Sequence, residues 1–226
     1  MLYALEHPAA FGVLVASLVV GLTLHGVVQA WAASWRGDRR PVREGRTKTD
    51  PRVQVDPFGA VAALISGLGW TRPLELQHAR RKDVLLAVSL SGPAVNILLG
   101  AGVLLARRFA YGSSDPFRFQ GAAYLLQHGG KLVGLGDVLL LVGASQLYLG
   151  VLSLVPVPPL DGGRLLFGLA PRTQGWLRAE HQLVERNIGV AILLALLLIP
   201  LGGPVPLLPD LLDTLLRPLL SLLCGG

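Results

Sequence analysis

One histidine lies deep inside an apolar run of the chain and has no charged neighbour in sequence. His25 stands in the uncharged run 8–35, four residues before Gln29. An ionisable side chain at membrane depth marks a candidate functional site, because lipid supplies no water to solvate it. Side chains four residues apart share one face of a helix, so His25 and Gln29 can hydrogen-bond each other or a neighbouring helix. The alternative is that His25 is the remnant of a metal site.

The other polar residues of interest lie far along the chain. Asp161 follows a proline-rich stretch and precedes Gly162. Its carboxylate can cap a new helix or bind a metal together with His25. One histidine and one carboxylate fall short of the three protein ligands usual at a catalytic zinc. Asn96 lies in another apolar run and can clamp two helices together. For all three residues a structural role is therefore favoured over a bound metal.

The composition places the chain in a membrane. Apolar residues make up 52% of the 226 residues and charged residues only 15%, and the mean hydropathy is +0.56. These values are not typical of a soluble globular domain. Four uncharged runs each offer the ~20 residues that a bilayer-spanning helix needs; they are 8–35, 84–106, 138–160 and 188–209. The first lacks the basic flank and short length of a cleaved signal peptide, so we expect it in the mature protein.

A basic loop after the first run sets the expected orientation. Residues 36–52 carry seven Lys or Arg against three Asp or Glu. An excess of Lys and Arg in a short loop near a span favours the cytoplasmic side. The loop is therefore predicted to be cytoplasmic in a multi-pass protein of the cell membrane. Because the loop has no aromatic residue to stack on bases, nucleic-acid binding is not expected, whereas contact with membrane lipids is.

The remaining segments are expected to be shorter parts of a single membrane domain, 1–226. Residues 57–71 are too few to cross and lie between two basic groups, which predicts a re-entrant or interfacial segment. Residues 107–136 have weak periodicity and are predicted to form an external loop. In the C-terminal hydrophobic region 188–226, residues 211–223 predict an amphipathic helix. The expected fold is an all-α polytopic helical bundle with about four full spans.

Three motifs, in order, resemble those of the site-2 proteases, which are membrane-embedded zinc metalloproteases. The stretch from His25 is similar to the family's zinc helix, in which His-Glu-x-x-His is followed by Ala-x-Ala and a Gly-Asp exit. A Gly-Pro-x-x-Asn motif ends at Asn96, and the proline-rich stretch around Asp161 resembles the second metal-ligand motif. Asp56-Pro-Phe-Gly and Gly69-Trp also occur in the family's order. The resemblance covers about residues 11–170.

The resemblance implies a zinc site of which this chain keeps two of four roles. In the family, two histidines and a distant aspartate bind zinc, and the glutamate after the first histidine is the general base. His25 and Asp161 match ligands, but Gly26 stands at the general-base position and Gln29 at the second histidine. Glycine cannot take a proton, and a neutral amide is a poor zinc ligand. Ser153 replaces an asparagine eight residues before Asp161.

Replacement ligands would have to come from elsewhere in the chain. Glu75 and His78 are the nearest candidates. Both belong to a polar segment beside the membrane, next to Arg72 and Arg80, so solvated side chains are the favoured interpretation.

The residues and the resemblance together predict a pseudoprotease that keeps the substrate-helix-binding scaffold, with Asn96, Ser153 and Gly162 in its cleft. It is expected to hold no zinc and to bind a transmembrane helix of a partner or substrate protein near His25 and Asp161. The alternative is an active intramembrane zinc metalloendopeptidase with a rearranged metal site. A pore or lipid-handling protein is disfavoured, because no internal repeat or series of charged pore-lining residues is present.

Overall fold

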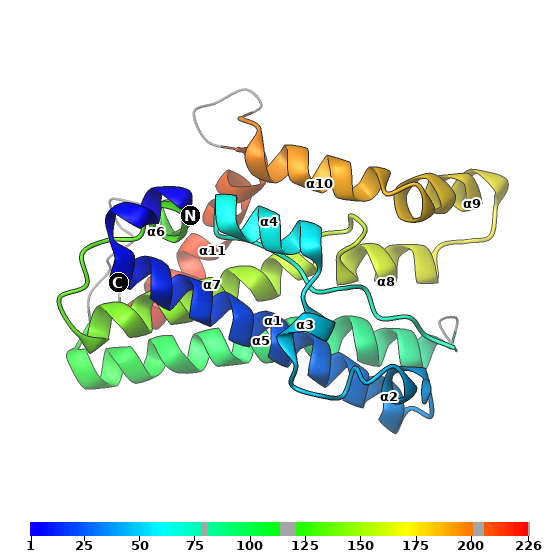
Figure 1. Cartoon of the computed structure of the whole chain (residues 1–226), viewed down its shortest axis with the longest axis horizontal. Coiled ribbons are helices and arrows are strands. Elements are labelled where there is room, and N and C mark those ends of the chain that lie inside the picture. The colour runs from blue at the N-terminus through cyan, green and yellow to red at the C-terminus, as the bar shows by residue number, and fades with distance from the viewer. Residues whose placement is uncertain (78–80, 114–120, 201–205, 226) are drawn as a thin grey trace.

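The fold is a helical bundle built on three helices of membrane-spanning length. The computed structural model describes residues 1–77, 81–113, 121–200 and 206–225, and over these residues it contains helices, one isolated bridge and no strand. α1 (Pro8–Trp35), α5 (Lys82–Tyr111) and α7 (Leu135–Ser153) are long and apolar enough to cross a membrane. They lie side by side along the long axis of the molecule (Figure 1). The predicted all-α membrane bundle is confirmed.

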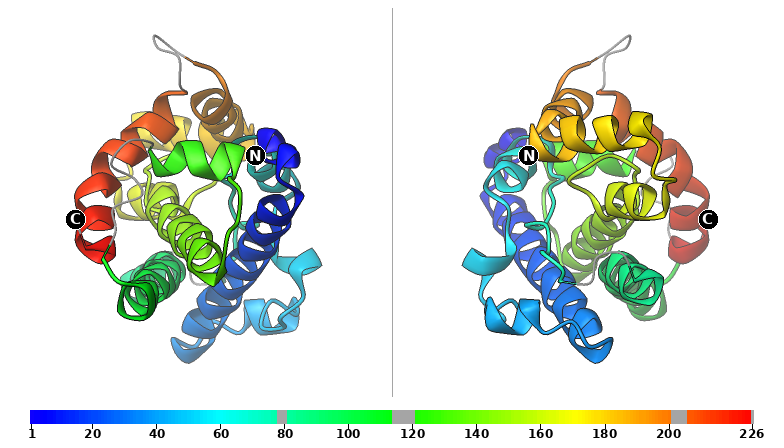
Figure 2. Two further views of the ribbon diagram at one scale, coloured as in Figure 1. Left: turned by 90° about the vertical axis from the view of Figure 1, so that its left-hand side faces the viewer. Right: turned by 90° about the vertical axis from the view of Figure 1, so that its right-hand side faces the viewer.

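α7 occupies the middle of this bundle. It packs against α1 and α5, and α6 (Ala122–His128) and α11 (Leu207–Cys224) also contact it (Figure 2). Tyr148 of α7 is fully buried. A Cβ on Gly100 of α5 would lie 2.7 Å from the carbonyl oxygen of Gly143 in α7, so small residues let these two backbones approach closely. The close packing fixes α5 and α7 around the centre of the molecule.

The short segment after the basic loop enters the fold and returns, as predicted. α4 (Pro57–Ser66) starts after Asp56, whose side chain accepts a hydrogen bond from the first turn, and ends at Gly67 in the left-handed conformation. An antiparallel bridge joins Val55 to Thr71. Because the two ends are paired, both must lie on the same side of the segment, which is the geometry of a re-entrant or interfacial element.

A buried arginine ties the basic loop to the chain on both sides of α4. The loop contains α2 (Arg40–Arg43), and α3 (Pro51–Gln54) begins at its end; η1 (Leu2–Glu6) precedes α1. Arg46 donates to the carbonyl oxygens of Val53 (2.6 Å) and Arg72 (2.7 Å). Burial, with the nearby charge of Arg72, lowers the pKa of the Arg46 guanidinium to about 10. Part of this cationic loop is therefore structural and not only a topology signal.

The sequence leaves open whether the run 188–209 crosses the membrane fully or breaks midway, and in the structure its helix stops at Leu198. α10 (Ile188–Leu198) ends before Pro200, because proline has no backbone N–H and restricts the residue before it. Two helices precede α10, namely α9 (Gln174–Glu180) and the π-helix η2 (His181–Glu185). They meet α10 at a bend of 67°, and the three together are long and apolar enough to form a broken span or a re-entrant loop. Within the described residues there are thus three candidate spans, or four if this bent pair is one.

Two further boundaries differ from the expectation. The predicted external loop 107–136 contains the end of α5, the start of α7 and the helix α6, whose Ala122 and Leu126 are buried against the bundle. The third predicted span stops at Ser153 and not at residue 160, because a proline-rich turn follows. In both cases tertiary burial and proline override the hydropathy pattern.

The C-terminal amphipathic helix is confirmed. α11 buries a leucine on every fourth residue against the bundle: Leu208, Leu212, Leu216 and Leu220. Asp213 accepts hydrogen bonds from the backbone N–H of Ala123 (3.0 Å) and from the hydroxyl of Tyr148. This carboxylate ties α11 to both α6 and α7.

Candidate functional site

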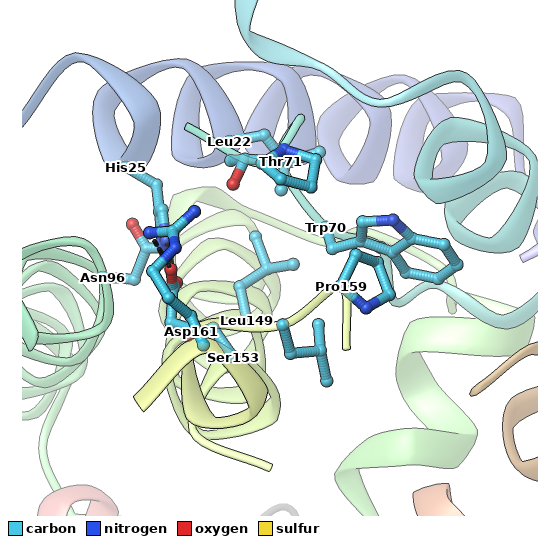
Figure 3. Close-up of a pocket in the computed structure, with 13 residues that line it drawn as sticks. Leu22, His25, Trp70, Thr71, Asn96, Leu149, Ser153, Pro159 and Asp161 are labelled. Carbon is cyan, nitrogen blue, oxygen red and sulfur yellow. Dashed lines mark hydrogen bonds and ion pairs between the residues drawn. The ribbon is translucent and has the colours of Figure 1, made fainter. Parts of the chain in front are cut away.

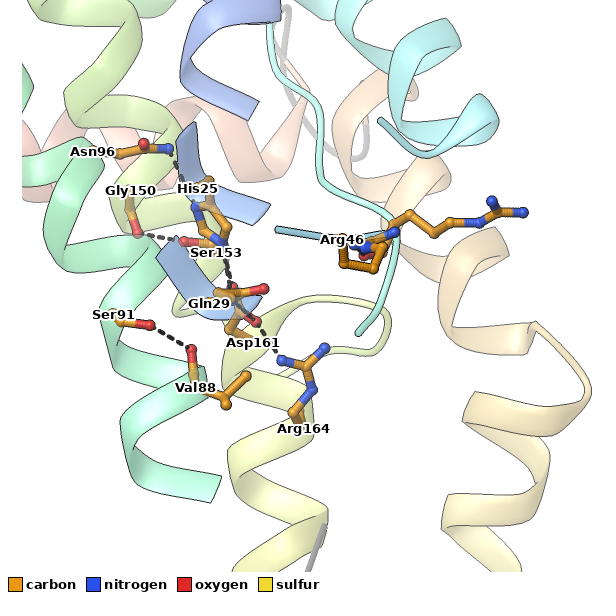
Figure 4. A network of polar contacts seen from close by, with 11 residues as sticks. His25, Gln29, Arg46, Val88, Ser91, Asn96, Gly150, Ser153, Asp161 and Arg164 are labelled. Carbon is orange, nitrogen blue, oxygen red and sulfur yellow. Dashed lines mark hydrogen bonds and ion pairs between the residues drawn. The ribbon is translucent and has the colours of Figure 1, made fainter. Parts of the chain in front are cut away.

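Asp161 is the centre of a buried polar network. It is the first residue of α8 (Asp161–Leu169) and is 4% exposed. Its Oδ2 lies 2.7 Å from Nε2 of His25. Its Oδ1 accepts from Nε2 of Gln29 (2.6 Å) and from Nη1 of Arg164 (3.1 Å) (Figure 4). Three side chains from two helices therefore engage one carboxylate.

His25 connects this carboxylate to α5. His25 is 2% exposed, and its Nδ1 lies 3.3 Å from Nδ2 of Asn96. A neutral imidazole with its proton on Nε2 donates to Asp161 and accepts from Asn96 at Nδ1. Neither ring nitrogen then has an unused lone pair. The predicted roles of Asn96 as a helix–helix clamp and of His25 as a hydrogen-bonded core residue match this geometry.

The donor set does not fit a resident zinc with three protein ligands. Among the described residues, no group of three or more His, Cys, Asp or Glu side chains could hold a metal ion. Gln29 turns its amide nitrogen, which is a donor without a lone pair to give, towards Asp161, and its distance to Nε2 of His25 is 3.1 Å. Asp161 thus receives hydrogen bonds where the family would use it as a metal ligand.

Other predicted site residues have structural roles. Asp161 does not cap α8: the capping position is Leu160, and the side chain of Asp161 bonds to other groups, so the N-cap interpretation is wrong. Ser153 donates to the carbonyl oxygen of Gly150 (2.7 Å) and only borders the site. Gly162 is buried in the first turn of α8.

Of the two candidate replacement ligands, the described one, Glu75, does not join the network. Glu75 is exposed and forms an ion pair with Arg40 of α2. Its position therefore does not support a role as a metal ligand. His78 lies outside the described residues. The residue that sequence reasoning did not assign is Arg164, although its spacing of three from Asp161 on one helix was a usable signal.

The space around the network is small, and a larger groove adjoins it. The cavity next to His25, Asn96 and Asp161 measures about 10 Å³, which is room for about one water molecule (Figure 3). A groove of about 580 Å³ lies beside it, between α8 and the arm formed by α9, η2 and α10. Leu160 and Arg164 line both spaces.

The core of this membrane-length bundle thus brings together His25 of the zinc-helix motif, Asp161 of the second metal-ligand motif and Asn96 of the Gly-Pro-x-x-Asn motif. The chain belongs to the site-2 protease family. It is 31% identical to "Putative zinc metalloprotease YwhC" of Bacillus subtilis over 211 residues, which is 90% of this chain and 89% of that protein. It is also 29% identical over 209 residues to "Putative zinc metalloprotease Rip2" of Mycobacterium tuberculosis, covering 87% of this chain and 70% of the relative. No family profile and no solved structure matches the chain.

Proposed function

We propose that this protein is a pseudoprotease: a site-2 protease scaffold that has lost peptide-bond hydrolysis and binds a partner transmembrane segment. The observation that carries the proposal is the engagement of Asp161 by His25, Gln29 and Arg164. The general-base position, Gly26, has no side chain to accept a proton.

The network supports a scaffold that does not need a metal for its stability. A carboxylate in a low-dielectric interior is costly unless it is paired and hydrogen-bonded. Arg164, which belongs to the motif shared with the family, supplies a positive charge, and Gln29, at the second histidine position, supplies a further donor. The site therefore does not depend on a cation to compensate Asp161, which supports a role other than hydrolysis.

The groove is the proposed place for the partner. The small cavity at His25 cannot admit a peptide, whereas the 580 Å³ groove beside it can take several side chains. Its lining combines apolar side chains such as Phe167 and Trp176 with charged ones such as Arg172 and Glu180. This combination suits the end of a transmembrane helix, where apolar residues give way to polar ones.

The metal content tests the catalytic part of the proposal. The zinc-to-protein ratio is measured on the full chain in mild detergent, for the unmodified protein and for Asp161→Ala. A ratio near zero in both is expected. A ratio near one that falls in the variant would instead support the active metalloendopeptidase, which the names of the relatives favour.

Crosslinking tests the partner-binding part. A photo-crosslinker at Trp176, in the groove, should capture a membrane protein in native membranes, while one at Leu98, exposed on α5, should not. Ala170→Trp, which fills the groove, should abolish the adduct. Equal capture at both positions, or none at Trp176, would contradict a specific partner site.

A further inference from the structure

The space beside Gly26 is already filled by another side chain. A Cβ built on Gly26 would lie 3.0 Å from Cδ of Gln54 and 3.4 Å from its Cβ, and closer still to its Oε1. Real Cβ atoms essentially never come as close to another heavy atom as this Cβ would come to Oε1, and the distance to Cδ is also tight, because overlap is repulsive. A side chain at position 26 and Gln54 in its present position therefore exclude each other.

Gln54 is held where it is by hydrogen bonds to the basic loop. It is the last residue of α3 and is 0% exposed. Its side-chain Nε2 donates to the backbone carbonyl oxygens of Arg46 (2.6 Å) and Lys48 (3.1 Å). Its backbone carbonyl oxygen accepts from the backbone N–H of Arg72 (2.7 Å). Moving the amide away from α1 would break the first two of these bonds inside a buried site, where lost hydrogen bonds are costly.

We infer that Gly26 and Gln54 form a matched pair, in which the Gln54 amide fills the general-base position and fastens the basic loop onto α1. Gln54 is a positioning residue for this loop. Its Oε1 has no hydrogen-bond partner among the described residues, so the contact with Gly26 is one of shape and not of polar pairing. The inference rests on the proposed loss of hydrolysis and extends it: a glutamate restored at position 26 alone would collide with Gln54.

The chain offers a matched control away from the site. Gly21, on the same helix, contacts Gln146 of α7 in the same way, since a Cβ on Gly21 would lie 2.6 Å from Nε2 and 2.8 Å from Cδ of Gln146. Gln146 donates to the carbonyl oxygen of Ser17 (2.7 Å) within the bundle and does not bind the basic loop. This pair has the same shape relation without the link to the loop.

A double-mutant cycle on the full chain in detergent tests the pair. Gly26→Ala should lower the thermal midpoint by on the order of 5 °C in the wild-type background and by much less in a Gln54→Ala background, where the space is open. Gly26→Ala should also raise trypsin cleavage within loop 36–52 several-fold, but add little to the cleavage already caused by Gln54→Ala.

The control cycle with Gly21→Ala and Gln146→Ala should couple in thermal midpoint and leave loop cleavage unchanged. Equal effects of Gly26→Ala in both backgrounds, or loop cleavage unaffected by it, would overturn the inference. The zinc ratio of the unmodified chain tests the proposed function separately, because the coupling between positions 26 and 54 does not depend on metal content.

Discussion

Gln29 donates to Asp161 at the position where the family has a second histidine, and it thereby turns a possible metal ligand into a hydrogen-bond acceptor. The amide can reach the carboxylate because α1 places positions 25 and 29 on one face. His25 then completes the network with its Nε2 at 2.7 Å from the same carboxylate. The residue type at position 29 therefore decides whether this face of α1 offers Asp161 an amide donor or a second imidazole.

Restoring a histidine at this position should restore metal binding. Gln29→His gives the site two histidines at i and i+4 plus Asp161, which is the three-ligand set of a catalytic zinc. We expect its zinc-to-protein ratio to rise towards one, with no hydrolysis, because Gly26 still supplies no base. Gln146→His, a buried glutamine outside the site, is the control and should hold no zinc. No rise in Gln29→His would indicate that the surrounding helices prevent the ligand geometry.

Arg164 should be important for stability because it is the cation nearest to the buried carboxylate. Arg164→Met leaves Asp161 without its positive partner and is expected to lower the free energy of unfolding by about 3 kcal/mol. Adding Asp161→Asn should recover part of that loss. Arg81→Met, which breaks the exposed ion pair with Asp83, should change stability little. Denaturant or thermal unfolding in detergent measures all three, and equal losses at Arg164 and Arg81 would contradict the argument.

At the scale of elements, α8 brings the site together. The proline-rich turn after α7 leads into α8, and the first residue of α8, Asp161, meets α1. α3 approaches the same helix from the other direction and brings Gln54 to Gly26. The site is therefore formed by two long helices, α1 and α5, and by two short elements that lie next to prolines.

α11 should depend on one carboxylate for its attachment. Asp213 accepts from Tyr148 of α7 and from Ala123 of α6, so Asp213→Ala leaves a buried hydroxyl and a helix N-terminal N–H without partner. The expected loss is about 2 kcal/mol of stability, with faster proteolysis of α11. Asp210→Ala, on the exposed face of the same helix, is the control. Unchanged proteolysis in Asp213→Ala would show that the leucine face alone holds α11.

At the scale of the whole molecule, the three spanning helices determine where the basic loop and the groove open. α1 and α7 run in the same direction along the bundle, and α5 runs in the opposite direction (Figure 1). The groove and loop 36–52 consequently lie towards the same end of the bundle. If the loop is cytoplasmic, as its charge predicts, a partner helix would meet the groove from the cytoplasmic side.

Cysteine labelling tests this orientation. In a Cys224→Ala background, Val42→Cys in the basic loop should react with a membrane-impermeant thiol reagent only after the inner face is exposed. Val133→Cys, exposed between α6 and α7 at the opposite end, should react in intact cells. The reverse pattern would show that the protein is inserted with its basic loop outside, against the distribution of Lys and Arg.

The sequence alone determined the membrane class, three of the spans and the returning segment, and it showed the departures at positions 26 and 29. Hydropathy, charge and motif are properties of neighbouring residues, so they can be read without the fold. The bend between η2 and α10 and the helix α6 were not predicted; α6 forms where Ala122 and Leu126 are buried against distant elements. Only the tertiary structure placed Asp161, 136 residues from His25, against that ring, and put Gln54 beside Gly26. Such contacts depend on how the helices pack, and no local pattern encodes that packing.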